Sequence, residues 1–205
     1  MSKDLSAIVN FLFEVGMLAK TPRSGFHFLT NHKQSVAEHI NRTAYIGYVL
    51  AMMEDDDKVD PATVMKMCLL HDLAEARTSD LNWMNQKYVT AHEEKAVHDL
   101  VQNLPFGEDI KKTIDTYEER TSLESKLAKD ADILELLLVL KEMIDVGHKK
   151  AKTWIPPMHK RLQTKSGRKL AKVIMKTDSD NWWYGNKKDT WWINRNGKDK
   201  LSSKK

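Results

Sequence analysis

The residues His71, Asp72 and Glu75 have the types and the spacing of a metal-binding or ion-paired cluster. His71 follows Cys68 by three residues and Val64 by seven, so a helical period turns its imidazole to the same buried face. Glu75 follows His71 by four residues and Asp72 by three, which lets the three polar side chains converge. Burying such groups costs free energy unless they are paired or bind a metal. The spacing therefore indicates a metal site or a network of ion pairs.

Two other polar residues lie on predicted apolar faces. His39 shares a helical face with Leu50, and Asp132 shares one with Leu136, so each needs a partner when it is buried. Asp130 lies two residues from Asp132, about 200° around the helix, and is predicted to face solvent. A mixed shell of imidazoles and carboxylates suits one divalent transition ion, such as Mn, Fe, Co, Ni or Zn, better than calcium or magnesium. The predicted metal ligands are His39, His71, Asp72 and Asp132.

A metal ion held this way would support hydrolysis of a phosphate ester. It lowers the pKa of bound water and neutralises phosphoryl oxygens. Glu75 and Asp80 are predicted to lie close to the ion without binding it, where they can position the attacking water and transfer protons.

The elements that position these residues are predicted to be helices throughout. Apolar residues recur with helical periodicity in nearly every long segment, and no segment alternates with period two. The residues 35–38, Ser-Val-Ala-Glu, form a capping box that starts a helix running to about Met53. Asp60-Pro61 provides an N-cap followed by proline at the first helical position. This next helix is expected to continue through Glu75. The sequence therefore predicts an all-α fold.

Other segments follow the same pattern. A stripe from Leu5 to Phe13 predicts a first helix packed on the core. Further capping boxes are expected at residues 90–93 and 121–124, the second opening the most apolar helix, which runs to about Gly147. Two shorter helical stretches follow, one starting at residues 156–157 (Pro-Pro) and one punctuated by residues 166–167 (Ser-Gly).

The order of these polar residues resembles a known family. His39, the His-Asp pair at 71–72 and Asp132 are similar to the H...HD...D pattern of the HD-domain metal-dependent phosphohydrolase superfamily. Longer blocks carry the resemblance further, toward the 5'-deoxynucleotidase branch. They are SVAEH at 35–39, LLHDLAEA at 69–76, SDL at 79–81 and KDAD at 129–132. The resemblance covers about residues 11–147 and implies a compact helical bundle, a transition metal and nucleoside monophosphate substrates.

The resemblance also implies roles for individual residues. The family's metal ligands fall on the four residues already named, and its catalytic acids fall on Glu75 and Asp80. Arg23-Ser24-Gly25-Phe26 resembles a phosphate-contacting motif in which tryptophan usually stands where this chain has Phe26. Glu118 resembles a glutamate that lines the substrate site. The resemblance further suggests a homodimer.

Composition excludes several other classes. The sequence has 41% hydrophobic and 30% charged residues, which is typical of a globular protein. It has no apolar run that could span a membrane and no secretory leader pattern. One cysteine among 205 residues suits a reducing cytoplasm. The net charge of +4 resides in the last eleven residues, which hold five basic side chains and one acidic, so nucleic-acid binding is not expected.

The domain organisation is read as one catalytic domain with an appendage. Residues 1–150 are predicted to form the HD phosphohydrolase domain, residues 151–194 a helical, tryptophan-rich extension packing on it, and residues 195–205 a disordered basic tail. The pairs Trp182-Trp183 and Trp191-Trp192 are expected to anchor the extension on its own core or on a neighbouring subunit.

Two other functions compete with a 5'-nucleotidase that releases phosphate from (deoxy)nucleoside 5'-monophosphates. One is hydrolysis of nucleoside triphosphates or of a guanosine tetraphosphate-type alarmone by the same metal chemistry. The other is a non-catalytic, metal-stabilised binding module that works through its tryptophans. The presence of both Glu75 and Asp80 argues against the last, because a structural metal needs neither.

Overall fold

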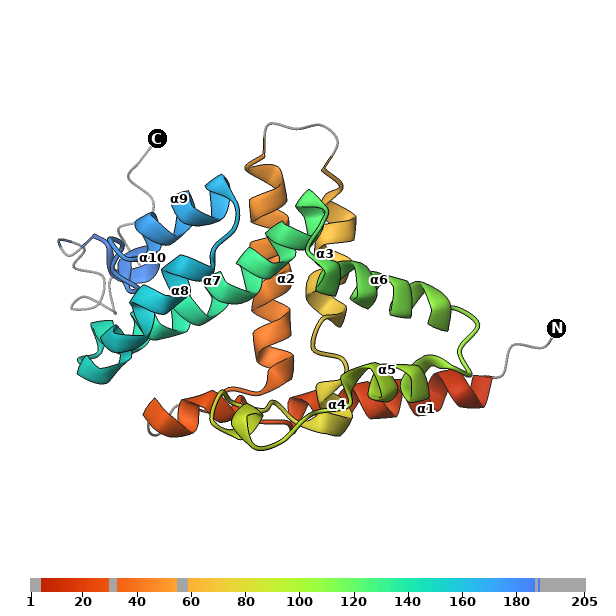
Figure 1. Cartoon of the computed structure of the whole chain (residues 1–205). Coiled ribbons are helices and arrows are strands. Elements are labelled where there is room, and N and C mark those ends of the chain that lie inside the picture. Colours follow the sequence, from red (N-terminus) through yellow and green to blue (C-terminus); the bar gives the residue numbers. More distant parts are fainter. Residues whose placement is uncertain (1–4, 30–32, 55–58, 187, 189–205) are drawn as a thin grey trace, which may run out of the picture.

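Three long helices form the centre of the molecule. The computed structural model describes residues 5–29, 33–54, 59–186 and 188, and every regular element in these ranges is a helix, which confirms the all-α prediction. Helix α7 (Leu123–Asp145) crosses α2 (Val36–Met52) and α3 (Pro61–Leu70), and all three pack on one another (Figure 1). No helix in the described ranges is long and apolar enough to cross a membrane.

Shorter helices cover this centre on two sides. Helices α1, α4 and α5 lie along one end, and α8, α9 and α10 pack around the second half of α7 (Figure 1). The bounds of the remaining helices are α1 Leu5–Val15, η1 Gly16–Ala19, η2 Ser24–Leu29, α4 Glu75–Thr78, η3 Asn85–Lys87, α5 Glu93–Val101, α6 Gly107–Glu119, η4 Lys149–Trp154, α8 Ile155–Arg161, α9 Lys165–Ile174 and α10 Asn181–Tyr184.

The helix starts follow the sequence signals unevenly. At α2 both bonds of the capping box form: the Ser35 hydroxyl accepts from the Glu38 amide, and the Glu38 carboxylate accepts from the Ser35 amide at 2.6 Å. Asp60 caps α3 as predicted. The predictions of capping boxes at residues 90–93 and 121–124 are wrong. Helix α5 begins after His92 without a side-chain cap, and α7 is capped by Ser122, one residue later than expected.

Helix α1 forms at the predicted place but turns a different face to the core. Ile8, Phe11 and Val15 pack against the neighbouring apolar cluster, whereas most of the predicted stripe is exposed, Phe13 to 77%. The expectation that the stripe from Leu5 to Phe13 packs on the core is therefore wrong, except at Ile8. Apolar residues occupy both sides of this helix, so periodicity alone could not select the buried one.

The third helix ends earlier than expected. Helix α3 stops at Leu70, His71 is its C-cap, and a turn separates it from the four-residue helix α4, which begins at Glu75. The prediction of one helix through Glu75 is wrong, because the backbone amides after His71 bond three residues back, as in Leu73 to Leu70 and Glu75 to Asp72. The turn still directs His71 and Asp72 toward α2 and α7.

The C-terminal segment continues the core before its character changes. Leu162, Ala171 and Ile174 belong to the same apolar cluster as the buried side of α7. On α10, Trp182 is 87% exposed, so it does not anchor this segment on the chain's own core. Trp191-Trp192 and the basic tail 195–205 lie outside the described residues.

Candidate metal centre

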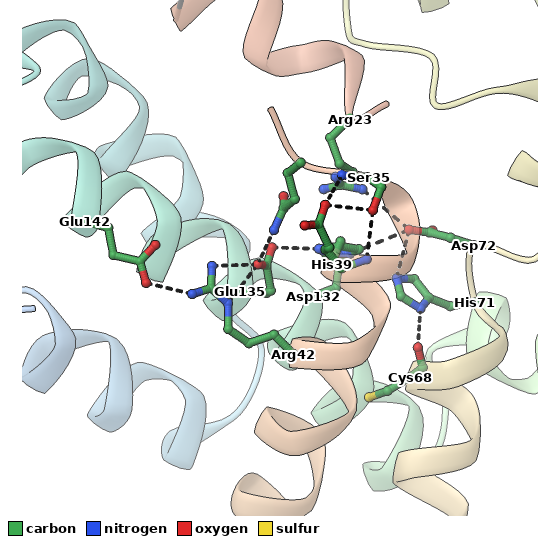
Figure 2. Close-up of polar contacts among 12 residues, drawn as sticks. Arg23, Ser35, His39, Arg42, Cys68, His71, Asp72, Asp132, Glu135 and Glu142 are labelled. Carbon is green, nitrogen blue, oxygen red and sulfur yellow. Dashed lines mark hydrogen bonds and ion pairs between the residues drawn. The ribbon is translucent and has the colours of Figure 1, made fainter. Parts of the chain in front are cut away.

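His39, His71, Asp72 and Asp132 come together where α2, α7 and the end of α3 meet (Figure 2). We call these four residues the histidine–aspartate cluster. One donor atom each from His39, His71 and Asp72 lies within 4.8 Å of the others. The Nε2 atom of His39 is also 3.3 Å from an Asp132 carboxylate oxygen. The four side chains therefore approach one another as the predicted metal ligands should.

The Nδ1 atom of each histidine has a hydrogen-bond partner within the protein. His71 Nδ1 lies 2.8 Å from the carbonyl oxygen of Cys68, and His39 Nδ1 lies 2.7 Å from a Glu135 carboxylate oxygen. Both partners are acceptors, so we assign the ring proton to Nδ1 in each case. Each Nε2 carries a lone pair when the ring is neutral, which is the form in which a histidine binds a metal. Both Nε2 atoms are buried without a hydrogen-bond partner, and both face Asp72.

The two aspartates of the cluster are ionised. Burial by itself raises the pKa of Asp72, but His71, His39 and Arg23 together lower it below its usual range. Burial likewise raises the pKa of Asp132, and Lys129, 2.7 Å away, and the two histidines lower it. Their side chains are 17% and 16% exposed, so a ligand can still reach them.

The cluster attracts positive charge. Burial and Arg23 lower the pKa of His39, yet the carboxylates of Asp132 and Glu135 beside its ring raise it to about 9. The carboxylates thus favour a cation at the His39 edge. Two buried Nε2 atoms without partners beside two carboxylates form a donor set that fits a divalent transition ion.

Glu135 and Arg42 support the cluster and were not identified from the sequence. The fully buried Glu135 accepts from Arg42 at 2.8 and 3.0 Å and from Gln34 at 2.7 Å, besides its bond with His39. Arg42 also pairs with Glu142 at 2.7 Å (Figure 2). A signal was present, because Glu135 is a carboxylate inside an apolar run and follows Asp132 by three residues.

Asp130 is buried, so the expectation that it faces solvent is wrong. Its carboxylate accepts from the amides of Gln163 and Thr164, at 2.7 and 2.8 Å, and from the Thr164 hydroxyl at 2.6 Å. It therefore holds the junction between α8 and α9. Gly167 lies against this carboxylate, since an ideal Cβ at this position would be only 2.2 Å from an Asp130 oxygen. A residue with a side chain would therefore collide there. The Ser-Gly signal is thus explained by a close approach of α9 to α7.

Residues 21–25, which we call the Arg23 loop, are hydrogen-bonded to Asp80 through Ser24. The amide of Ser24 donates to the Asp80 carboxylate at 2.7 Å, and the Ser24 hydroxyl donates to the Asp80 carbonyl oxygen at 2.5 Å. Arg23 places its guanidinium 3.5 Å from Asp72. The structure thus brings the predicted Arg23 and Asp80 together beside the cluster, and Ser24 is the link that sequence reasoning did not assign.

Glu75 lies near this group but outside the hydrogen-bonded cluster. One of its carboxylate oxygens is buried without a partner. Burial, reinforced by Asp72 and Asp80 and opposed by Arg23, raises the pKa of Glu75 to about 10. Glu75 therefore holds a proton at neutral pH.

The two remaining predicted substrate contacts are placed differently. Phe26 is buried against the apolar side of α7. Glu118 is exposed, pairs with Arg120 at 3.5 Å and lines a cavity of about 280 Å³ together with His71 and Glu93. Arg23 does not line that cavity. The structure does not bring Glu118 and Arg23 into one pocket.

A larger cleft of about 540 Å³ opens beside Arg23 and Asp80. We call it the Trp154 cleft. It runs from the Arg23 loop to α8, and it is lined by Arg23, Gly25, Phe26, Asp80, Asn82, Trp83, Leu136, Thr153, Trp154, Pro157, Met158 and Arg161. Its volume is in the range of small-molecule sites.

Known proteins resemble this chain in sequence and in fold. A sequence model of the HD domain matches residues 15–174. The 5'-deoxynucleotidase HDDC2 of Homo sapiens is 30% identical over 151 residues, which cover 70% of this chain and 71% of that protein. The solved PH0347 protein of Pyrococcus horikoshii OT3 has a TM-score of 0.68 and 26% identity, covering 82% of this chain and 98% of its own.

A second solved structure shares the fold at lower identity. It is described as a predicted metal-dependent phosphohydrolase from Magnetospirillum magnetotacticum MS-1, with a TM-score of 0.67 and 22% identity over 85% of this chain and 92% of its own.

Proposed function

The chain belongs to the HD domain family, and from this premise we propose that it is a metal-dependent 5'-nucleotidase acting on (deoxy)nucleoside 5'-monophosphates. The observation that carries the proposal is the pair of buried Nε2 atoms of His39 and His71, which lack hydrogen-bond partners and face ionised aspartates next to Arg23. The names of the 5'-deoxynucleotidase relatives support the substrate class.

The histidine–aspartate cluster would hold the metal. His39 and His71 would contribute Nε2, and Asp72 and Asp132 one carboxylate oxygen each. We propose one divalent transition ion, Mn, Co, Fe, Ni or Zn, because the donors are mixed nitrogen and oxygen. When bound, such an ion lowers the pKa of water and neutralises phosphoryl oxygens.

Arg23 would bind the phosphate group. Its guanidinium already lies 3.5 Å from Asp72, and it matches phosphate oxygens in geometry and charge. The hydrogen bonds between Ser24 and Asp80 hold the loop that carries it. Asp80 thus fixes the position of the phosphate relative to the cluster.

Glu75 would donate a proton to the leaving nucleoside. Burial raises the pKa of Glu75 and so favours its protonated form, and a protonated carboxyl beside the phosphate can donate to the departing 5' oxygen. Nucleoside leaves as an alcohol, and inorganic phosphate is the other product.

The test is a screen of purified protein loaded with each of the five metals. The substrates are nucleoside monophosphates, triphosphates and an alarmone, with phosphate, triphosphate and pyrophosphate measured separately. We expect phosphate from monophosphates and a loss of roughly 10³-fold in Asp72→Ala, the loss of several kcal/mol that a catalytic metal supplies. Asp178→Ala, which removes an exposed carboxylate after α9 that does not belong to the cluster, serves as the control. Metal-replete protein that releases no phosphate from any monophosphate would contradict the proposal.

A further inference from the structure

The Trp154 cleft presents aromatic surface directly beside the Arg23 loop. An ideal Cβ on Gly25 would lie 4.0 Å from two ring carbons of Trp154, so this ring packs next to the backbone of the loop. Trp83 lines the same cleft and is 56% exposed. Phe26 also lines the cleft but is only 3% exposed, so most of the exposed aromatic surface belongs to Trp154 and to Trp83, over whose ring the Lys87 ammonium lies 4.2 Å from the centroid.

The cleft walls between the two tryptophans are apolar. Leu136, Pro157 and Met158 supply them. Methionine adapts its shape and contacts flat rings favourably. A planar, largely apolar group would therefore lose little by entering this space and would gain stacking on the tryptophans.

Most polar groups in the cleft are already bonded within the protein. The Thr153 hydroxyl donates to the Lys150 carbonyl at 2.8 Å. The Asn82 side chain donates to Ser24 and accepts from two backbone amides at 3.0 Å. Arg161, by contrast, is exposed, and the only hydrogen bond of its guanidinium among the described residues is a 3.8 Å contact with the Met158 sulfur. Arg161 thus offers free donors to the cleft, whereas the carboxylate of Asp80 in the same lining already accepts from Ser24.

We propose that the Trp154 cleft binds the nucleobase of the substrate and that Arg161 favours guanine; the inference rests on the proposed nucleotidase function. Arg23 and Asp80 line one end of the cleft, so a phosphate at Arg23 leaves the base in the same continuous space. Aromatic side chains stack on every base. A guanidinium matches the adjacent O6 and N7 acceptors of guanine, whereas adenine presents a donor beside its N7.

The experiment compares metal-loaded wild type with Trp83→Ala, Trp154→Ala and Arg161→Gln. The substrates are the four deoxynucleoside monophosphates and 2-deoxyribose 5-phosphate, which has no base. We expect each tryptophan variant to lower kcat/KM for nucleotides about 5- to 150-fold and to leave the base-free substrate unchanged. Arg161→Gln should reduce the preference for dGMP over dAMP by about fivefold or more.

Matched controls come from the same segment of the chain. Trp182→Ala removes an exposed tryptophan outside the cleft, and Lys160→Gln removes a neighbouring exposed charge on α8; neither should change the base preference. If Trp154→Ala fails to fold, the exposed Trp83 and Arg161 variants still decide the question.

Binding of deoxyguanosine by calorimetry separates this inference from the function it rests on. Wild type should bind the nucleoside more tightly than Trp83→Ala even if no phosphate is released, in which case only the nucleotidase proposal fails. Equal losses on 2-deoxyribose 5-phosphate, absence of a dGMP preference, or nucleoside binding that is the same in wild type and Trp83→Ala would overturn the base site.

Discussion

The histidine–aspartate cluster and the Trp154 cleft adjoin each other at Arg23, yet they are held in different ways. The cluster takes its side chains from the long helices α2 and α7 and from the end of α3, and its histidines are fixed by buried partners. The cleft takes most of its walls from the short elements η2, η4 and α8 and from the loop after α4. In the proposed function, the catalytic residues are therefore held by the helical core, and the base-binding residues lie on segments that can vary without disturbing that core.

The largest effect on stability should come from removing Asp130, which bonds the segment between α8 and α9 to α7. Asp130→Ala leaves two amides and a hydroxyl near α8 and α9 without their acceptor, so we expect the free energy of unfolding to fall by about 3 kcal/mol. Urea denaturation measures the loss. The exposed Asp115→Ala should change it far less.

The same variant tests whether the two regions are separable. Gln163, bonded to Asp130, follows Arg161 by two residues, so folded Asp130→Ala should lose preference among bases while its metal affinity stays unchanged. A parallel fall in metal affinity would show that the two regions are one unit.

A smaller effect is expected inside the cluster. Glu135→Gln removes the charge that holds the His39 ring through its Nδ1 proton, and partners of this kind alter metal affinity by about 10- to 100-fold. Equilibrium metal competition measures the change without relying on activity. Glu142→Gln, which alters the exposed partner of the same arginine, should leave metal affinity unchanged; a similar loss in both variants would assign the effect to Arg42 instead.

The smallest effect concerns the turn that links the two regions. Ser79 has φ 63° and ψ 161°, a conformation that residues with a Cβ rarely adopt, and it directly precedes Asp80. Ser79→Gly should therefore raise the free energy of unfolding by about 1 kcal/mol. Thr78→Gly, in helical geometry one residue earlier, should lower it by a similar amount. Chemical denaturation of both variants should show shifts of opposite sign, and a loss in both would mean that the turn carries no strain.

What the sequence could predict follows the same division. Helix caps and apolar periodicity are local, so Ser35 and Asp60 located α2 and α3, and buried polar positions indicated His39 and His71. The partners of the two aspartates on α7 were harder to predict. A helical period gives the angle between Asp130 and Asp132, but it does not show which element each side chain faces. Asp130 accepts a hydrogen bond at the start of α9, whereas Asp132 lies 3.3 Å from the Nε2 atom of His39.

The features that the sequence did not predict correctly depend on contacts between segments that are distant along the chain. Nothing local ends α3 at Leu70, and the exposed side of α1 is as apolar as its buried side. The Trp154 cleft joins residues more than 100 positions apart, so no spacing rule could reveal it.

The contact between α2 and α3 allows the separation of these two helices to be measured as a rate. An ideal Cβ on Gly47 would lie 2.6 Å from the Cys68 sulfur, so the two helices touch there, between the segments that carry His39 and His71. Burial raises the pKa of this thiol, and it is the chain's single cysteine. An alkylating reagent can reach it only while the helices are apart. The rate of labelling therefore reports how often α2 and α3 separate, and no cysteine has to be introduced.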